Sequence, residues 1–141
     1  MLFRSNADVN VQDEDGDTAL IVASYYGNGA ITKLLLERNP GLDHQNKEGW
    51  TALMWASNEG HQSFVELLLE RNPNLDAQNK EGTALILASK KGHTDIVKNL
   101  LRKGADMTIK QNGDGKTAKD WAKKKKFVNL VNISLHRYAL Y

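Results

Sequence analysis

Cysteine is absent from the 141 residues of the chain. This excludes a disulfide-stapled scaffold, a thiol nucleophile and any metal site built on thiolates. The sequence also lacks an apolar run of the roughly 18 residues that a membrane-spanning helix needs. The opening stretch, MLFRSNADVN, has no apolar core of the kind found in signal peptides. Together these absences predict a soluble intracellular protein, with the cytoplasm as its expected compartment.

The chain has little net charge, because 19 Lys/Arg nearly balance 17 Asp/Glu and leave a formal charge of +2. The distribution is uneven, however. Residues 1–89 contain six Lys/Arg and 13 Asp/Glu, a balance of −7, whereas residues 90–141 contain 13 and four, a balance of +9. Such asymmetry concerns the surface field and its partners rather than the fold. It predicts that an acidic partner is steered toward the C-terminal part.

The sequence repeats itself every 33 residues. Segments with the same pattern begin at Gly16, Gly49, Gly82 and Gly115, and the third lacks one residue directly after its glycine. Self-similarity at this period is typical of a solenoid. The predicted single domain, residues 1–141, therefore comprises a partial repeat (1–12), three complete repeats (13–45, 46–78 and 79–111) and a degenerate C-terminal capping repeat (112–141).

Each unit is predicted to fold as two short helices followed by a polar, hairpin-like loop. Small and apolar residues at i, i+1 and i+4 of the first helix, such as Ala19, Leu20 and Ala23, allow neighbouring helices to approach closely. Gly27 is expected to end this helix, and Asn39 the second, because both tolerate left-handed backbone. A threonine that can cap the first helical turn precedes the first helix of three units: Thr18, Thr51 and Thr83.

The second helix of the first unit is expected to bury Ile31, Leu34 and Leu35. Because no complete unit precedes it, the outer side of Leu20 and Ile31 is expected to be exposed. This face predicts that the chain either is a fragment of a longer array or associates with itself. At the other end, Lys119 stands where other units have a core leucine, as expected for the polar outer face of a terminal repeat.

The unit pattern is G-x-T-A-L-x-x-A-x-x-x-G-H, as in residues 49–61, followed by I/F-V-x-L-L-L and an ADVN-like loop entry. With this pattern the sequence resembles the ankyrin repeat family over essentially the whole chain. The resemblance implies an all-α ankyrin-repeat solenoid, an L-shaped stack of helix-turn-helix units with β-hairpin-like loops and a concave face. It implies a non-catalytic protein–protein interaction module or scaffold. The segment Asp8-Val9-Asn10 also resembles the substrates of asparagine hydroxylases, which implies Asn10 as a modification site.

The family's usual partner surface comprises the residue after each loop glycine and the pair that ends each first helix. Trp50 is expected to be the main anchor, because its equivalents Asp17 and Lys116 are polar. Tyr25 and Tyr26 are expected to bind the partner, although covering the helix end is the alternative. The predicted groove runs from acidic and aromatic to basic: Asp17, Tyr25 and Tyr26; Trp50, Asn58 and Glu59; Lys90 and Lys91; Lys116, Lys124 and Lys125.

Two other tryptophans have apolar equivalents. Trp55 and Trp121 occupy the repeat position of Val22 and Leu87, so packing between repeats is their expected role. His44 is isolated in the sequence and predicts no function.

The sequence predicts no metal site, no cofactor and no enzyme. His61 and His93 follow the helix-ending glycines and are expected to hydrogen-bond across the loops, since a zinc site needs further converging ligands. Residues 13–18, DEDGDT, lack the ligand spacing of a calcium loop and are interpreted as a loop tip. Residues 113–117, GDGKT, lack the first glycine of a phosphate-binding loop. No nucleophile has a base at matched spacing.

A block of lysines, Lys123 to Lys126, follows Lys119 and Trp121. It can form a solvated cap face, bind phosphate or nucleic acid, or act as a nuclear-import signal. Two alternatives to groove binding therefore remain. The repeats can be purely architectural within a longer array, or the lysine block can bind phosphate or nucleic acid.

Overall fold

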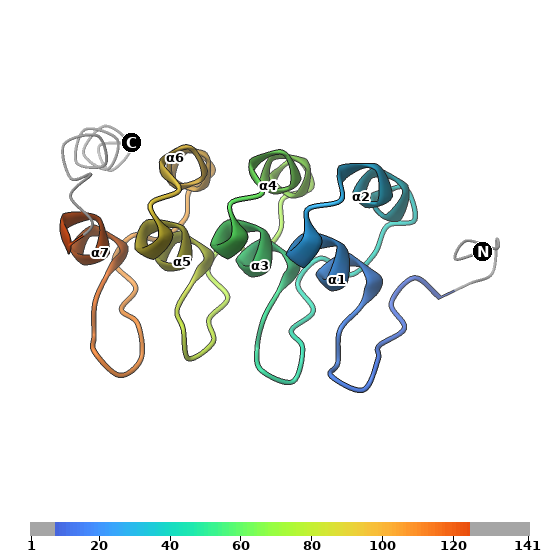
Figure 1. The fold of residues 1–141 in the computed structure, drawn as a ribbon, viewed down its shortest axis with the longest axis horizontal. Helices are drawn as coiled ribbons and strands as arrows, with labels where there is room; N and C mark the ends of the chain where they lie inside the picture. The colour runs from blue at the N-terminus through green and yellow to red at the C-terminus, as the bar shows by residue number, and fades with distance from the viewer. Residues whose placement is uncertain (1–7, 125–141) are drawn as a thin grey trace.

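The computed structural model of the chain describes residues 8–124, which form a row of stacked helix pairs (Figure 1). No strand occurs in this range, where Asn79 and Gly82 form an isolated antiparallel bridge. The all-α solenoid expected from the sequence is thus confirmed. The helices are α1 (Ala19–Tyr26), α2 (Gly29–Leu36), α3 (Ala52–Glu59), α4 (Gln62–Leu69), α5 (Ala84–Lys91), α6 (Thr94–Arg102) and α7 (Ala118–Lys124).

The helices form two rows. The inner helices α1, α3, α5 and α7 pack against one another in that order, and α2, α4 and α6 form the outer row. The loops that join one pair to the next project from the side of the inner helices (Figure 1). Among the described helices, each pair thus packs against the pairs before and after it, as in other solenoids.

The inner helices begin at the predicted threonines. The hydroxyl oxygens of Thr18, Thr51 and Thr83 accept hydrogen bonds from the backbone amides three residues later, at 3.3, 3.1 and 3.2 Å. Each threonine has extended backbone, so its side chain satisfies an amide that the helix itself leaves unpaired. The same cap in successive units sets the inner helices in register.

The core lies between the rows and continues through all the described repeats. Ala52, Leu53 and Ala56 of α3 are at most 2% exposed, as are Phe64 and Leu68 of α4. Small residues on the inner row let the backbones approach, and the large residues of the outer row fill the space behind them. The sequence pattern thus predicted the core of the central repeats correctly.

At the N-terminal end two expectations were wrong. Leu20 is 1% exposed, because it faces the core of its own helix pair and the following repeat rather than the open end. Leu34, expected in the core, is 50% exposed. Ile31 is 38% exposed, which agrees with the expectation that its outer side is open. The helices α4 and α6 each pack against the outer helix of the preceding repeat, whereas the described residues contain no outer helix before α2. Only Leu35 of the predicted trio is fully buried.

Candidate partner-binding groove

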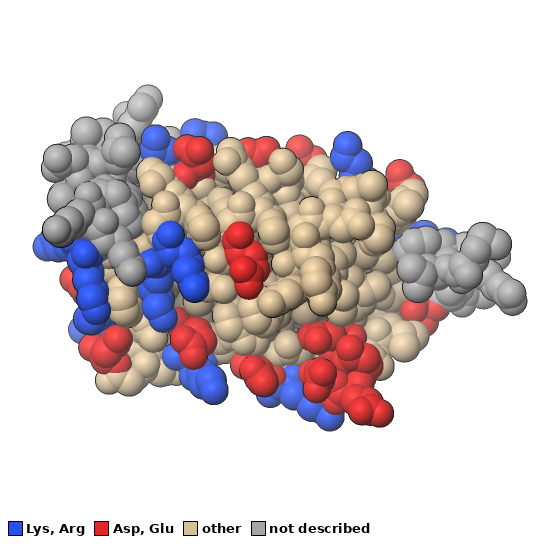
Figure 2. Space-filling model, viewed as in Figure 1, with Lys and Arg blue, Asp and Glu red and all other residues tan. Residues whose placement is uncertain are grey.

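The candidate groove, where the sequence predicts partner binding, is the surface formed by the C-terminal halves of the inner helices and the loops beside them. At its N-terminal end a hollow of about 270 Å³ lies between α1 and α3. In the space-filling view uncharged residues cover α1 and most of α3, with one acidic side chain over α3, whereas Lys and Arg gather over α5 and α7 (Figure 2). The hollow is lined by Asp17, Ile21, Val22, Tyr25, Tyr26 and Trp55.

An aromatic cluster forms the wall of this hollow. Tyr25 contacts both Tyr26 and Trp55 edge to face, with ring centroids 5.0 and 4.9 Å apart. Trp50 stacks on Trp55 with a centroid distance of 3.9 Å and an interplanar angle of 13°. Tyr25 is 42% exposed and Tyr26 is 73% exposed. These two tyrosines therefore contribute most of the cluster's exposed aromatic surface.

Trp50, which the sequence predicts to be the main anchor, is buried in the structure. Its side chain is 8% exposed, because the indole lies flat against Trp55. Trp55, expected only to pack between repeats, is half-buried and lines the hollow as well. At this end of the groove Trp55 is therefore more accessible than Trp50, which stacks on it.

Lysines surround the other tryptophan, at the C-terminal end of the groove. The ammonium nitrogens of Lys90, Lys116 and Lys124 lie 4.9, 4.6 and 5.0 Å from the centroid of the Trp121 ring. The indole nitrogen of Trp121 donates a 3.0 Å hydrogen bond to Oε1 of Gln111, which fixes the ring. Cation–π attraction holds each lysine over this ring. We call these three lysines with Trp121 the lysine cluster.

Two models of known protein families match the sequence of this array. A family model described as ankyrin repeats in three copies matches residues 1–79, and one described as ankyrin repeats in many copies matches residues 67–122. The chain belongs to the ankyrin repeat family. Ankyrin repeats are generally protein–protein interaction modules, so the family agrees with the expected non-catalytic class.

Within this ankyrin array, two histidines connect successive repeats. Nε2 of His61 lies 2.9 Å from the carbonyl oxygen of Tyr25, and Nε2 of His93 lies 3.1 Å from that of Asn58. Both carbonyls belong to the last turn of an inner helix, where the helix supplies no amide partner. The expected bonds across the loops are confirmed, and they hold the ends of α1 and α3 that form the groove.

The first two loops of the ankyrin array are tied together beside the hollow. Nδ2 of Asn46 donates to Oδ1 of Asp17 at 2.8 Å, so this groove residue is already engaged. Nε2 of His44 lies 2.9 Å from the carbonyl oxygen of Gly16. His44 therefore connects two repeats, a role that its isolated position in the sequence did not reveal.

Acidic residues gather at the tip of the first loop. Asp13, Asp15 and Asp17 bring one carboxylate oxygen each to within 4.8 Å of one another. Oδ1 of Asp13 accepts from the amides of both other residues at 2.9 Å, which builds the turn. In the next loop Oδ1 of Asn46 plays the same part. Turn geometry thus explains the cluster, in agreement with the sequence interpretation of a loop tip.

The middle and basic parts of the groove contain the remaining predicted residues. Asn58 is half-buried at the end of α3, and its neighbour Glu59 is exposed. Lys91 is exposed at the end of α5, whereas Lys90 is half-buried and forms a 3.6 Å ion pair with Glu81. Lys125 and Lys126 lie outside the described residues. The structure thus places the described members of the predicted set along one surface but divides them into an aromatic and a basic end.

At the start of α7, Thr117 donates two hydrogen bonds to the carboxylate of Asp120. The backbone amide of Thr117 donates to Oδ2 of Asp120 at 3.0 Å, and its hydroxyl does so at 3.1 Å. Both hydrogen bonds stabilise the charged carboxylate and lower the pKa of Asp120 below its ordinary value, and the bond from the backbone amide has the larger effect. An acidic residue in a first helical turn also interacts favourably with the helix dipole. Asp120 therefore helps to fix the helix that carries Trp121.

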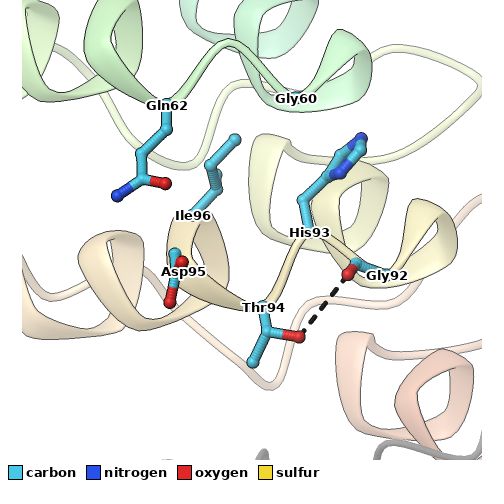
Figure 3. A pocket seen from close by; sticks show the side chains of 7 residues that line it. All are labelled: Gly60, Gln62, Gly92, His93, Thr94, Asp95 and Ile96. Carbon is cyan, nitrogen blue, oxygen red and sulfur yellow. Dashed lines mark hydrogen bonds between the residues drawn. The ribbon is translucent and has the colours of Figure 1, made fainter.

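A second hollow, of about 320 Å³, lies beside the loops that follow α3 and α5 (Figure 3). Its ionisable side chains are His93, which already bonds to Asn58, and Asp95. Thr94 points toward the Gly92 carbonyl at 3.5 Å (Figure 3). Sequence reasoning did not indicate this hollow, and it lacks the apolar walls that partner sites favour.

Asn10, the predicted modification site, forms a hydrogen bond to the next repeat. Oδ1 of Asn10 accepts from the amide of Gly41 at 2.8 Å, as Oδ1 of Asp43 does from Asn74 one repeat later at 2.7 Å. Asn10 thus has a structural role, and its hydroxylation stays a prediction.

Among residues 8–124, every helix is too short or too polar to span a bilayer.

Proposed function

We propose that this ankyrin array binds a protein partner in the groove, with an apolar group of the partner in the hollow between α1 and α3 and acidic groups against the lysine cluster. The observation that carries the proposal is that the two residues at the end of each inner helix change from aromatic to basic along the array. Tyr25 and Tyr26 of α1 give way to Lys90 and Lys91 of α5. Aromatic residues beside charged ones are typical of interaction hot spots.

The proposed role is non-catalytic, without a metal or cofactor, and suits a cytoplasmic scaffold. Within the family, residues 71–97, RNPNLDAQNKEGTALILASKKGHTDIV, resemble the ankyrin array of the kinase-D-interacting neurotrophin-receptor scaffold. Electrostatic steering by the basic end mainly raises the association rate, so association is expected to slow as salt is added.

Site-specific photo-crosslinking tests this proposal. A photoreactive amino acid replaces Tyr26 or Lys91 in the groove, or Lys33 or Glu37 on the outer row as matched exposed controls. A partner crosslinked in cells from both groove positions but from neither control supports groove binding. Crosslinking from the outer row alone, or equally from all positions, overturns it. Nucleic acid as the main crosslinked species favours the lysine-block alternative.

A further inference from the structure

We infer that the groove recognises an extended peptide segment with one apolar side chain and, five or six residues away, a run of carboxylates. This inference rests on the proposed groove-binding function and specifies its ligand. It follows from four features of the described residues. These are the size of the hollow, the grouping of the lysines, the distance from the hollow to the lysine cluster, and the charge of Glu59.

The hollow between α1 and α3 suits a single side chain. Its volume of about 270 Å³ lies below the range of about 300–1,000 Å³ of pockets that enclose a whole small molecule. Val22, 41% exposed, and the Tyr25 and Trp55 rings give it apolar walls. An aromatic or large aliphatic side chain of a peptide can lie against these walls while its backbone follows the groove.

The lysine cluster suits several carboxylates rather than one. Since each ammonium nitrogen lies within 5.0 Å of the Trp121 centroid, no two of them are more than about 10 Å apart. This upper limit is close to the Debye length of about 8–10 Å at 0.1–0.15 M salt, so the three charges act together. Glu81 pairs with Lys90 and offsets one of them. Contact with the indole restricts the lysine side chains before a partner arrives, which lowers the entropy lost on binding.

The number of helix steps between the two ends sets the spacing of the ligand. The hollow lies between α1 and α3, and the lysine cluster lies between α5 and α7, two steps further along the inner row. Packed helices are about 8–10 Å apart, which gives about 16–20 Å. An extended peptide advances about 3.3 Å per residue, so five or six residues span the distance.

Glu59 determines where the carboxylates of the ligand are tolerated. It is exposed at the end of α3, between the two ends of the groove. Its charge repels carboxylates at the middle of the peptide and favours a neutral or basic residue there. A uniformly acidic peptide is therefore a poorer ligand than one with its charges at the lysine end.

Fluorescence anisotropy with designed peptides tests the inference. The probe is a labelled peptide with one Phe and three consecutive Glu, with six residues from the Phe to the first Glu along a Gly/Ser spacer. Matched peptides have spacings of two or twelve residues, and all are made in both chain directions. For one direction, the six-residue spacing is expected to bind about tenfold more tightly than the two-residue spacing, which cannot reach both ends of the groove. It is expected to bind about threefold more tightly than the twelve-residue spacing, whose longer flexible spacer lowers the effective concentration of the second group.

Protein variants assign the two ends. Tyr26→Ala is expected to weaken the six-residue peptide about fivefold, as is the double variant Lys116→Ala/Lys124→Ala. Lys33→Ala/Lys103→Ala removes the same charge away from the groove and is expected to change the affinity less than twofold. Only the lysine-cluster variant should lose most of the salt dependence. Unchanged thermal melting of each variant confirms that the fold is intact.

Several results would overturn the inference. These are an affinity that does not depend on spacing, an equal loss in the Lys33/Lys103 control, or stronger binding of a single-stranded oligonucleotide than of any peptide. If groove crosslinking succeeds while the spacing has no effect, the proposed function stands and this ligand assignment fails. If neither the crosslinking nor the peptides give binding in the groove, both fail.

Discussion

Nε2 of His61 lies 2.9 Å from the carbonyl oxygen of Tyr25, so a loop residue of one repeat holds the helix end that carries an aromatic wall residue of another. The ring also passes over Gly27, where an added Cβ would lie 2.5 Å from Nδ1 of His61. Gly27 has φ +74°. The position therefore requires glycine both for its conformation and for the space that the imidazole occupies.

We expect His61→Ala to lower the free energy of unfolding by about 1 kcal/mol, because the carbonyl of Tyr25 loses its partner. Gly27→Ala should be more harmful than Gly92→Ala. Both glycines have φ near +75°, but among the described residues no neighbouring atom lies within 4 Å of a Cβ built at Gly92. Urea unfolding of the three single variants measures their free energies of unfolding. The double variant Gly27→Ala/His61→Ala should recover part of the loss, and no recovery would contradict the close contact.

Thr51→Ala should destabilise the protein by about 1 kcal/mol, because the amide of Met54 loses the cap oxygen 3.1 Å away. Thr51→Ser keeps the hydroxyl and serves as the control. Chemical denaturation compares the two. Equal stability of both variants would show that the cap contributes little here.

Trp50→Ala and Tyr26→Ala should separate stability from binding. Trp50 is 8% exposed and stacked, so its truncation is expected to destabilise the fold by about 3 kcal/mol. Tyr26 is 73% exposed, so its truncation should change stability by less than about 0.5 kcal/mol. Thermal melting beside a binding assay distinguishes them. A stable Trp50→Ala variant that fails to bind would restore Trp50 as the anchor.

Leu34→Ala and Leu35→Ala form a matched pair on α2. Leu35 is fully buried, and its truncation is expected to lower the free energy of unfolding by about 2–5 kcal/mol. Leu34 is 50% exposed, and its truncation should have an effect below about 1 kcal/mol. Denaturation of both at two protein concentrations is informative. A large, concentration-dependent effect at Leu34 alone would indicate the self-association expected from the sequence.

The stability of the α7 end should depend on pH in the acid range. Because hydrogen bonds from Thr117 lower the pKa of Asp120 in the folded state, its contribution is present above the unfolded pKa of about 4. The contribution is lost as the pH falls through the lower, folded pKa. Asp120→Asn should show less of this loss than the unchanged chain. NMR titration of the carboxyl carbon measures the pKa, and an ordinary value would refute the assignment.

The repeat length, the threonine caps and the helix-ending glycines were predictable because each depends on residues close together in the sequence. Thr18 caps the helix that begins one residue later, and Gly27 ends it. The cross-loop bonds of His61 and His93 were predictable too, because the repeat places them at the same offset each time. Side chains that contact residues of another repeat were less predictable, as His44 and Leu34 illustrate.

The sequence by itself determined an array of helix pairs and the sign of charge at each end, since periodicity and composition are properties of the chain alone. Only the tertiary structure decided which side chains of the groove are available. Trp50 and Asp17 occupy equivalent positions, yet the first is buried by stacking on Trp55 and the second is bonded to Asn46. Trp55 and Trp121 also share a position, but tyrosine edges flank one and lysines the other. The exposure of each groove residue depends on which side chains of the neighbouring repeats contact it, because every repeat packs against the next.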